Sequence, residues 1–191
     1  MNTARVAGRF LVGVLATGTL VLAGCDSGGA DSSTGSEAQY DSPIINEDIP
    51  KMDISTLPDI DATRADMLAL IEQVHAEVAR LVPASAPWTW RHTETRDGCE
   101  RNGVRGVSLY FAKLTSSHSF TDDEWNLVLP AVERLAAAAG LTNGSAMQNS
   151  SGAHDVSITS DDGRELRFGS LEASLITGTI VCRLPAGGGA P

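Results

Sequence analysis

Residues 88–117 read WTWRHTETRDGCERNGVRGVSLYFAKLTSS, and this stretch decides the fold class of the chain. Its first part alternates at period two, and its last part is rich in β-branched and aromatic residues. Between them lies Asn102-Gly103, a dipeptide typical of tight hairpin turns. We therefore expect a β-hairpin with strands over residues 88–98 and 105–115.

In a strand, alternate side chains point to opposite faces, so the first arm would place four side chains on one face: Trp88, Trp90, His92 and Glu94. One interpretation buries the tryptophans under helices and lets His92 and Glu94 emerge at the sheet edge. The other makes an aromatic shelf for a sugar or lipid, with His92 and Glu94 as polar guides or metal ligands. We favour the first, because a chain with three tryptophans and four phenylalanines needs these rings for its core.

Two amphipathic helices flank the hairpin in the sequence. Residues 63–82 repeat apolar side chains at steps of three and four, and Thr63 is placed to cap their start. The later segment opens with the capping box Thr121-Asp-Asp-Glu124 and ends at Gly140, a common helix terminator. Pro130 inside it removes one backbone hydrogen bond, so we expect a kink there.

The C-terminal part predicts three more strands. Residues 153–170 read as a hairpin around Asp162-Gly163, and residues 174–184 read as a closing strand. Asn143-Gly-Ser and Asn149-Ser-Ser are expected to be turn residues. The order helix, two strands, helix, three strands predicts an α+β domain: an antiparallel sheet of about five strands with two helices packed on one face.

The N-terminus resembles a bacterial lipoprotein signal. Residues 1–24 hold two arginines and then an apolar run of about 13 residues, shorter than the roughly 20 that a permanent membrane helix needs. The run closes with Leu22-Ala-Gly-Cys25, which resembles the lipobox, where the cysteine receives a diacylglycerol and the chain is cut before it. We expect residues 1–24 to be a signal peptide and Cys25 to be the lipidated mature N-terminus. The alternative is an ordinary secretory peptide.

A diacyl anchor implies a location at the extracytoplasmic face of the cell membrane, because each buried methylene contributes about 0.8 kcal/mol. Loss of Arg5 and Arg9 with the signal leaves 12 of 14 basic residues beside all 24 acidic ones, a net charge of −12. This balance argues against nucleic acid as a partner.

The mature chain divides into three parts by composition. Residues 25–58 are rich in glycine, serine and carboxylates, which predicts an acidic disordered tether behind the lipidated cysteine. Residues 59–185 have the size of a single domain, and residues 186–191 read as a disordered tail. An alternative for the tether is a short docking peptide made of Ile44, Ile45, Ile49 and Met52.

With Cys25 lipidated, Cys99 and Cys182 remain as an even pair in an oxidising compartment, which predicts a structural disulfide. A two-cysteine metal or redox site usually needs closer spacing. We expect no metal ion and no cofactor. His118 and His154 lie in segments expected to be loops, and no H-E-x-x-H, G-x-S-x-G or S-x-x-K motif occurs.

Five features together resemble the small actinobacterial cell-envelope lipoproteins of the LppA/LppV type: the lipobox, the acidic spacer, WTWRHTE…GC after a first helix, TDDEWNLVLPAVERLAAAAGL, and a terminal strand with the second cysteine. The resemblance covers most of the domain and implies an envelope lipoprotein without an established enzymatic activity. It assigns roles to Cys25, Cys99 and Cys182 alone.

These observations predict a non-catalytic binding or accessory module of the cell envelope. It would recognise an envelope protein or glycolipid through the exposed sheet face or through a groove between helix and sheet. One alternative is a lipid or glycolipid carrier with an acyl chain between helices and sheet. A less favoured alternative is a metal-dependent hydrolase that uses His92 and Glu94, with His118 or His154.

Overall fold

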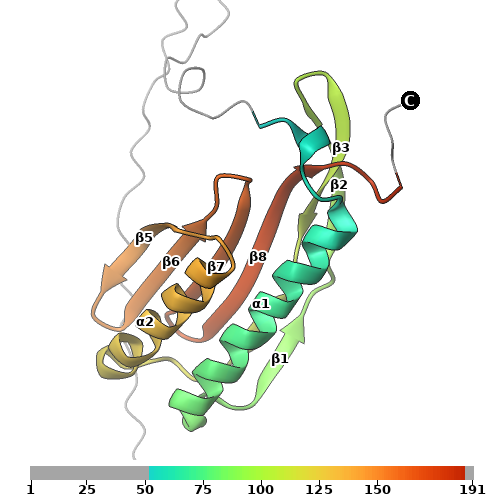
Figure 1. Ribbon diagram of the computed structural model, residues 1–191. Helices are drawn as coiled ribbons and strands as arrows, with labels where there is room; N and C mark the ends of the chain where they lie inside the picture. Colours follow the sequence, from blue (N-terminus) through green and yellow to red (C-terminus); the bar gives the residue numbers. More distant parts are fainter. Residues whose placement is uncertain (1–51, 188–191) are drawn as a thin grey trace, which may run out of the picture. The chain divides into compact units, whose positions relative to one another are not determined.

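The computed structural model describes residues 52–187 (Figure 1), so the predicted signal peptide, Cys25 and most of the tether lie outside the described residues. The elements in chain order are η1 (Ile54–Thr56), α1 (Ile60–Leu81), η2 (Pro83–Ser85), β1 (Trp88–Arg91), β2 (Thr95–Arg101), β3 (Val104–Tyr110), β4 (Lys113–Ser116), α2 (Asp122–Ala138), β5 (Asn143–Ser150), β6 (Ala153–Thr159), β7 (Arg164–Ser170) and β8 (Ser174–Arg183).

The strands form one antiparallel sheet with β8 near its middle. On one side β8 pairs with β7, and β6 and β5 follow outward to the edge. On the other side the first half of β8 pairs with β4 and the second half with β3, while β1 and β2 lie outside them. The α+β class and the antiparallel sheet are therefore confirmed, but the strands number eight instead of about five.

Two of the extra strands arise because each arm of the predicted hairpin is broken. The turn at Asn102-Gly103 is present between β2 and β3. The first arm breaks at His92, where a φ of 62° changes the direction of the chain. β1 therefore ends before this residue and β2 begins after it. The second arm breaks after Tyr110, so β4 pairs with β1 while β3 pairs with β2. The expectation that Trp88, Trp90, His92 and Glu94 lie on one face of a single strand was therefore wrong.

The third extra strand is β5, where we expected turn residues. It pairs with β6 from Asn143 to Ser150, and all eight of its residues are exposed. A strand at the edge of a sheet, with no helix over it, needs no apolar side chains, which is why its composition resembled a loop.

Both helices lie on the same face of the sheet (Figure 1), and one apolar cluster fills the space between helices and sheet. Asp59 caps α1, because its Oδ1 accepts from the amide of Ala62 at 2.8 Å. Thr63, the expected cap, is buried inside the helix and donates to the Asp59 carbonyl at 2.8 Å. The capping box of α2 is present, with Glu124 N 3.2 Å from Thr121 Oγ1.

The tryptophans contribute unequally to the core. Trp125 on α2 is 4% exposed and stacks on Phe168 of β7, with ring centroids 4.8 Å apart. Trp88 is half-buried beside His75 of α1. Trp90 is 43% exposed, so its expected burial was wrong. The cause is the position of β1 at the edge of the sheet, where its one partner strand is β4.

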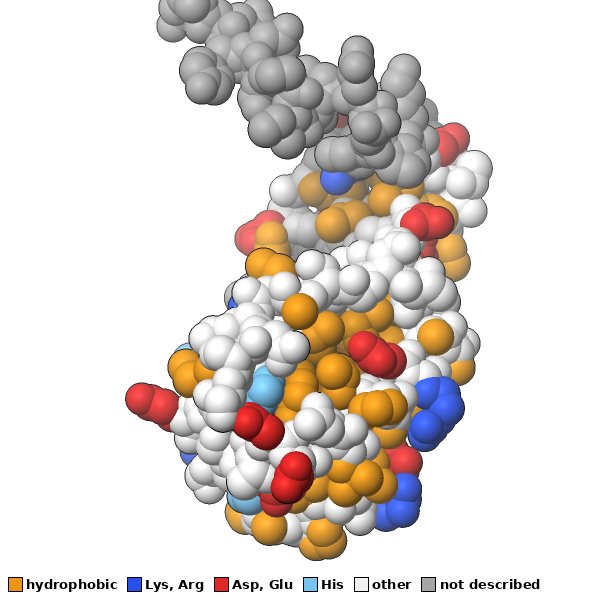
Figure 2. All heavy atoms as spheres, turned by 90° about the vertical axis from the view of Figure 1, so that its left-hand side faces the viewer, with side chains coloured by type: hydrophobic (Ala, Val, Ile, Leu, Met, Phe, Trp, Pro, Cys, Tyr) orange, Lys and Arg blue, Asp and Glu red, His pale blue; other side chains and the backbone are white. Residues whose placement is uncertain are grey.

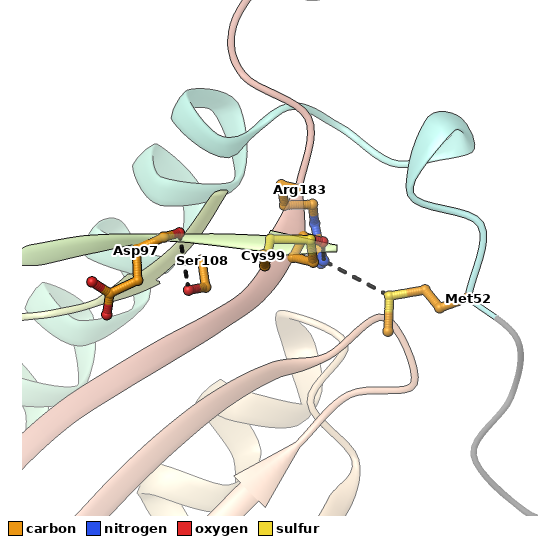
Figure 3. Close-up of a disulfide and its surroundings, with 6 residues drawn as sticks. Met52, Asp97, Cys99, Ser108 and Arg183 are labelled. Atoms are coloured by element: carbon orange, nitrogen blue, oxygen red, sulfur yellow. Dashed lines mark hydrogen bonds between the residues drawn. A yellow bond between two sulfur atoms is a disulfide. The ribbon is translucent and has the colours of Figure 1, made fainter. Parts of the chain in front are cut away.

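The predicted disulfide is present: Cys99 of β2 and Cys182 of β8 are bonded, with Cα atoms 5.7 Å apart (Figure 3). Gly106 of β3, the register partner of Cys99, makes room for it. A Cβ at this position would lie 2.8 Å from Cys182 Sγ and 2.5 Å from the Arg183 carbonyl oxygen. The bond therefore ties the hairpin to the central strand through a contact that only glycine permits.

The folded region begins before residue 59, where we placed its start. Ile54 in η1 is 1% exposed, and Met52 approaches the buried side chain of Arg183. Residues 52–58 therefore belong to the domain, because their apolar side chains find partners on it.

Candidate functional site

The structure keeps apart the four side chains of the hydrolase hypothesis, His92, Glu94, His118 and His154. Glu94 forms an ion pair with Arg64 of α1, with Nε 2.7 Å from Oε2. His118 Nε2 lies 3.0 Å from Glu124 Oε2, and exposed His92 occupies the break between β1 and β2. Within residues 52–187 no group of three or more His, Cys, Asp or Glu side chains is arranged to hold a metal ion.

His154 lies in β6, and not in a loop as we expected, and its side chain is 6% exposed. Its ring stacks on Trp125 with centroids 4.7 Å apart and planes 8° from parallel. Trp125 also stacks on Phe168, so the rings of His154, Trp125 and Phe168 form one aromatic stack that joins β6, α2 and β7. The two ring nitrogens of His154 each lie 3.1 Å from an oxygen, Oδ1 of Asn149 and Oδ1 of Asp122.

Asp122, the first residue of α2, ties this helix to the turn between β5 and β6. The amide of Gly152 donates to its Oδ1 at 2.8 Å and the hydroxyl of Ser151 donates to its Oδ2 at 2.7 Å, while His154 Nε2 lies 3.1 Å from the same Oδ1. These hydrogen bonds, led by that of Gly152, hold the pKa of the Asp122 carboxyl below its ordinary value. The start of α2 is thus fixed to one end of β5.

Beyond this anchor, an open groove runs between α2 and β5. One hollow of 160 Å³ and a second of 260 Å³ share Glu133 and Gly144 in their linings, so they adjoin. We call them together the α2–β5 groove. Its helix side is Trp125, Leu129, Glu133 and Ala137; its strand side is Gly144, Ser145, Ala146, Gln148 and Asn149; its remaining lining is Leu141, Thr142, Asp155, Val156 and Ile158.

Figure 2 faces this side of the molecule and shows apolar side chains gathered in a hollow, with carboxylates at its margin. The groove exists because β5 carries small side chains, Gly144 and Ala146, on the side that faces α2. A Cβ added at Gly144 would meet no atom within 4 Å. Gly144 and Ala146 lie opposite Ile158 and Val156 of β6, so the floor is apolar while nothing from β5 fills the space above it.

The groove lies in an acidic part of the surface. Residues 121–170 contain eight carboxylates and three arginines. Each of these arginines is close to a carboxylate: Arg164 to Asp162 at 2.9 Å, Arg134 to Glu77 at 3.5 Å, and Arg167 to Asp155. Glu133, on the groove itself, is exposed.

Another hollow, of 390 Å³, lies between α1 and α2. Its apolar lining comes from both helices, and Asp66, Gln73 and Arg164 provide the polar part. The lining consists of Asp66, Met67, Ala69, Leu70, Gln73, Leu135, Ala138, Ala139 and Arg164.

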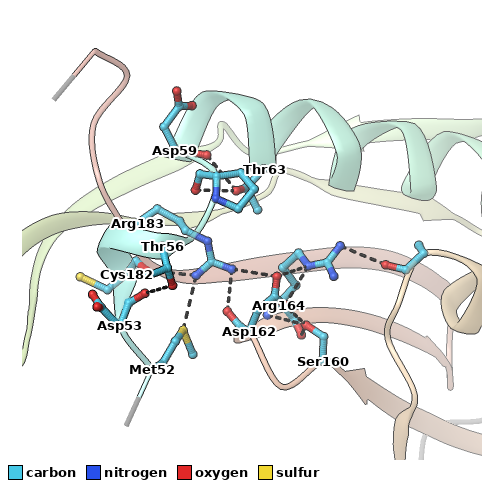
Figure 4. Close-up of polar contacts among 12 residues, drawn as sticks. Met52, Asp53, Thr56, Asp59, Thr63, Ser160, Asp162, Arg164, Cys182 and Arg183 are labelled. Atoms are coloured by element: carbon cyan, nitrogen blue, oxygen red, sulfur yellow. Dashed lines mark hydrogen bonds and ion pairs between the residues drawn. The ribbon is translucent and has the colours of Figure 1, made fainter. Parts of the chain in front are cut away.

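A buried polar cluster surrounds Arg183 at the C-terminal end of β8 (Figure 4). The Arg183 side chain is 0% exposed, and its Nη2 donates to the Asp162 carbonyl at 2.6 Å and lies 3.3 Å from Asp162 Oδ2. Its Nη1 donates to the Cys182 carbonyl at 3.0 Å and lies 3.8 Å from Met52 Sδ. We call these residues, with the disulfide, the Arg183–disulfide cluster.

Charge and burial oppose each other in this cluster. Burial raises the pKa of the Asp162 carboxyl, but hydrogen bonds from Ser160 and Arg164 and the charges of Arg164 and Arg183 outweigh it, so that pKa lies below its ordinary value. Burial also lowers the pKa of the Arg183 guanidinium. Such an arrangement fixes structure, because removal of either partner leaves a buried charge uncompensated.

Sequence reasoning did not place the groove at β5, and it missed the Arg183 partners. The alternation of His154, Val156 and Ile158 in β6 was a visible signal that His154 belongs to a strand. No sequence signal showed that Arg183 would be buried against Asp162, since the two residues meet only across the β7–β8 pairing.

A family model for LppA, described as a lipoprotein confined to pathogenic Mycobacterium, matches residues 24–186. Among curated proteins no match was found. Within residues 52–187 no helix is long and apolar enough to span a membrane.

Two solved structures resemble the chain. A DUF4853 family protein from Actinomyces odontolyticus is 14% identical, with 73% of this chain and 75% of that chain covered and a TM-score of 0.47. A protein from Mycobacterium tuberculosis described as the lipoprotein LppA is 17% identical, with 70% and 87% covered and a TM-score of 0.48. Because the family model spans most of the sequence, Cys25, Cys99 and Cys182 included, the chain belongs to the LppA family of lipoproteins.

Proposed function

We propose that the protein is a lipid-anchored binding module of the cell envelope. A diacylated Cys25 would hold it at the extracytoplasmic face of the membrane, and the α2–β5 groove would contact its ligand. Membership of a lipoprotein family supports the anchor. The groove supports the binding role, and this role needs no catalytic side chain.

The observation that carries the proposal is the open groove itself, which lies between α2 and the fully exposed edge strand β5. Ligand sites are concave and mostly apolar, with a few polar groups at the margin. The groove has this composition: Val156 and Ile158 lie below, and Glu133, Ser145 and Gln148 lie at its margins. A ligand in the groove would cover the half-buried Leu129 and the exposed Ala137 and Ala146, and would gain the free energy of burying their apolar surface.

The helix-free face of the sheet is a weaker candidate because its polar groups bond to one another. Glu165 accepts from Ser157 at 2.6 Å and from Thr179 at 3.1 Å. Thr177 likewise bonds the carbonyl of Phe111 at 3.2 Å. Side chains that already have partners gain less from a ligand than unsatisfied ones do.

Photo-cross-linking in the native membrane tests the binding role. A photoreactive phenylalanine analogue replaces Ala146, on the strand side of the groove, in the intact lipoprotein. The matched control carries the same analogue at Glu72, an exposed position of α1. We expect a discrete adduct with an envelope component from Ala146 only. No adduct, or the same adducts from both positions, would contradict the proposal.

The anchor has an independent test. Intact mass of the mature protein should show a chain that begins at Cys25 and carries added lipid mass. A Cys25→Ser variant should leave the membrane fraction, since its acyl attachment point is lost. A mature protein without lipid mass, or a variant that stays in the membrane fraction, would contradict the anchor.

A second candidate, a lipid or glycolipid carrier, is favoured by the hollow of 390 Å³ between α1 and α2. Met67, Leu70 and Leu135 supply the apolar part of its lining, against which an acyl chain would lie, and Asp66, Gln73 and Arg164 supply the polar part, which would face a headgroup. Native mass spectrometry of protein purified from its own envelope should then reveal a co-purifying lipid. Absence of any adduct under conditions that keep other lipoproteins loaded would remove this candidate.

A further inference from the structure

We infer that the occupant of the α2–β5 groove is an extended, basic polypeptide segment that adds to the sheet as a strand beside β5. Its apolar side chains would reach over Gly144 and Ala146 into the groove. This inference rests on the proposed function and names the partner class for the same site.

The first argument is the edge itself. In the described part of the chain β5 pairs only with β6, so its outer side presents backbone N–H and C=O groups for another strand. Native edges are commonly protected by charged side chains or proline, and β5, with the sequence NGSAMQNS, contains neither. The strand β2 on the other side of the sheet carries Arg96, Asp97, Glu100 and Arg101.

The second argument is the register of β5. Its pairing with β6 is regular from Asn143 to Ala146 and shifts between Ala146 and Gln148, so Met147 is an extra residue in the strand. A bulge bends the edge and interrupts continued pairing. The incoming strand is therefore confined to residues 143–146, and these residues adjoin the groove.

The third argument is the space above β5. Side chains on neighbouring strands lie about 5 Å apart, so those of an added strand lie beside Gly144 and Ala146. Glycine has no side chain and alanine has one methyl group, so a leucine- or valine-sized neighbour can lean across them. It would then contact the half-buried Leu129 on the helix side of the groove.

The fourth argument is charge. Residues 121–170, which contain α2 and β5, hold eight carboxylates and three arginines, and each of these arginines is close to a carboxylate. Asp161 bonds Asn143 at the start of β5, Asp122 bonds Ser151 just beyond its end, and Glu133 lies between. Lysine or arginine side chains of a partner strand would offset this negative potential.

The same charge argues against two other occupants. A second copy of the domain would bring an identical acidic surface to the contact. The chain's own N-terminal segment is also unsuitable, because residues 26–51 contain six acidic residues and one lysine. Like charges placed together at a contact disfavour it.

The test uses the full-length lipoprotein in nonionic detergent and a fluorescent peptide of about ten residues in which lysine and valine alternate. Fluorescence anisotropy should detect binding that weakens as salt is raised. Two control peptides should fail to bind: one with glutamate in place of lysine, and one whose lysine–valine backbone is N-methylated on both edges. N-methylation keeps the charge and the side chains but removes the strand hydrogen bonds.

Two glycine variants locate the contact. Gly144→Phe fills the groove, and Gly98→Phe places the same ring on β2, where a Cβ also meets no atom within 4 Å. We expect Gly144→Phe to weaken peptide binding by about ten-fold or more, as loss of a central contact does. Gly98→Phe should leave binding unchanged.

Several outcomes would overturn the inference: no binding of the lysine–valine peptide, equal binding of its N-methylated form, or no effect of Gly144→Phe. A dimer in sedimentation that Gly144→Phe dissociates would overturn it in favour of self-association. If Ala146 cross-links to an envelope component while the peptide does not bind, this inference fails and the proposed function stands.

Discussion

The Arg183–disulfide cluster and the α2–β5 groove use glycine for opposite reasons. At Gly106 a Cβ would meet the Arg183 carbonyl oxygen at 2.5 Å, so the close approach of strands and disulfide excludes every other residue. At Gly144 a Cβ would meet nothing within 4 Å. The first region is closed by covalent, ionic and steric constraints, and the second is left unfilled. The difference indicates which region maintains the fold and which is available to a ligand.

The largest expected effect is loss of the disulfide. A Cys99→Ser/Cys182→Ser variant should lose about 4.5 kcal/mol of unfolding free energy on the chain-entropy model, because the bond closes a loop across 83 residues of sequence. Urea unfolding measures this loss. Reductant should shift the wild-type midpoint and leave the variant unchanged. Two reactive thiols in the unreduced wild type would contradict the bond.

Next comes Asp162→Asn, which should cost about 3 kcal/mol because it removes the carboxylate beside the fully buried Arg183. The matched variant Arg183→Met removes the buried charge itself and should cost less. Urea unfolding of both variants gives the order. A larger loss for Arg183→Met would show that the cluster stabilises the fold by packing instead of charge compensation.

The comparison of glycines can be tested directly. Gly106→Ala should destabilise the protein by about 1–3 kcal/mol, because the added methyl group has no space and the backbone must shift. Gly144→Ala should be neutral or stabilising by up to about 1 kcal/mol, since glycine weakens a strand interior. Equal changes in unfolding free energy at the two positions would contradict the claim that the region around Gly106 is closed and the region around Gly144 is open.

The sequence predicts the parts of the fold that local patterns encode. Three such features were predicted and are present: the capping box at Thr121, the turn at Asn102-Gly103 and the Cys99–Cys182 disulfide. The first two depend on neighbouring residues alone, and the third depends on the oxidising compartment. The break at His92 could not be foreseen, because a positive φ at a non-glycine residue is imposed by the surrounding structure.

The candidate site was predicted only in outline, as a groove between helix and sheet or an exposed sheet face. Its position depends on β5, an edge strand with no apolar pattern for a periodicity argument to detect. The start of α2 is fixed to β5 by Asp122, whose hydrogen-bond partner His154 is 32 residues away in the sequence. Such long-range contacts are set by tertiary packing.

The smallest stability effect concerns pH. Because the folded-state pKa of Asp122 lies below its ordinary value of 3.8, its contribution to stability is complete above that pH and is lost as the pH falls through the lower folded-state value. The difference in unfolding free energy between wild type and Asp122→Asn should therefore narrow below about pH 4. Urea titrations across pH measure it, and a constant difference would contradict the hydrogen-bonded anchor.

The most direct test of the central claim is chemical cross-linking of the intact lipoprotein in its own membrane, compared among wild type, Gly144→Phe and Gly98→Phe. The account predicts one neighbour that is captured by wild type and Gly98→Phe and lost in Gly144→Phe. Capture that survives Gly144→Phe, or that both variants lose equally, would contradict the claim that the open groove is the binding region.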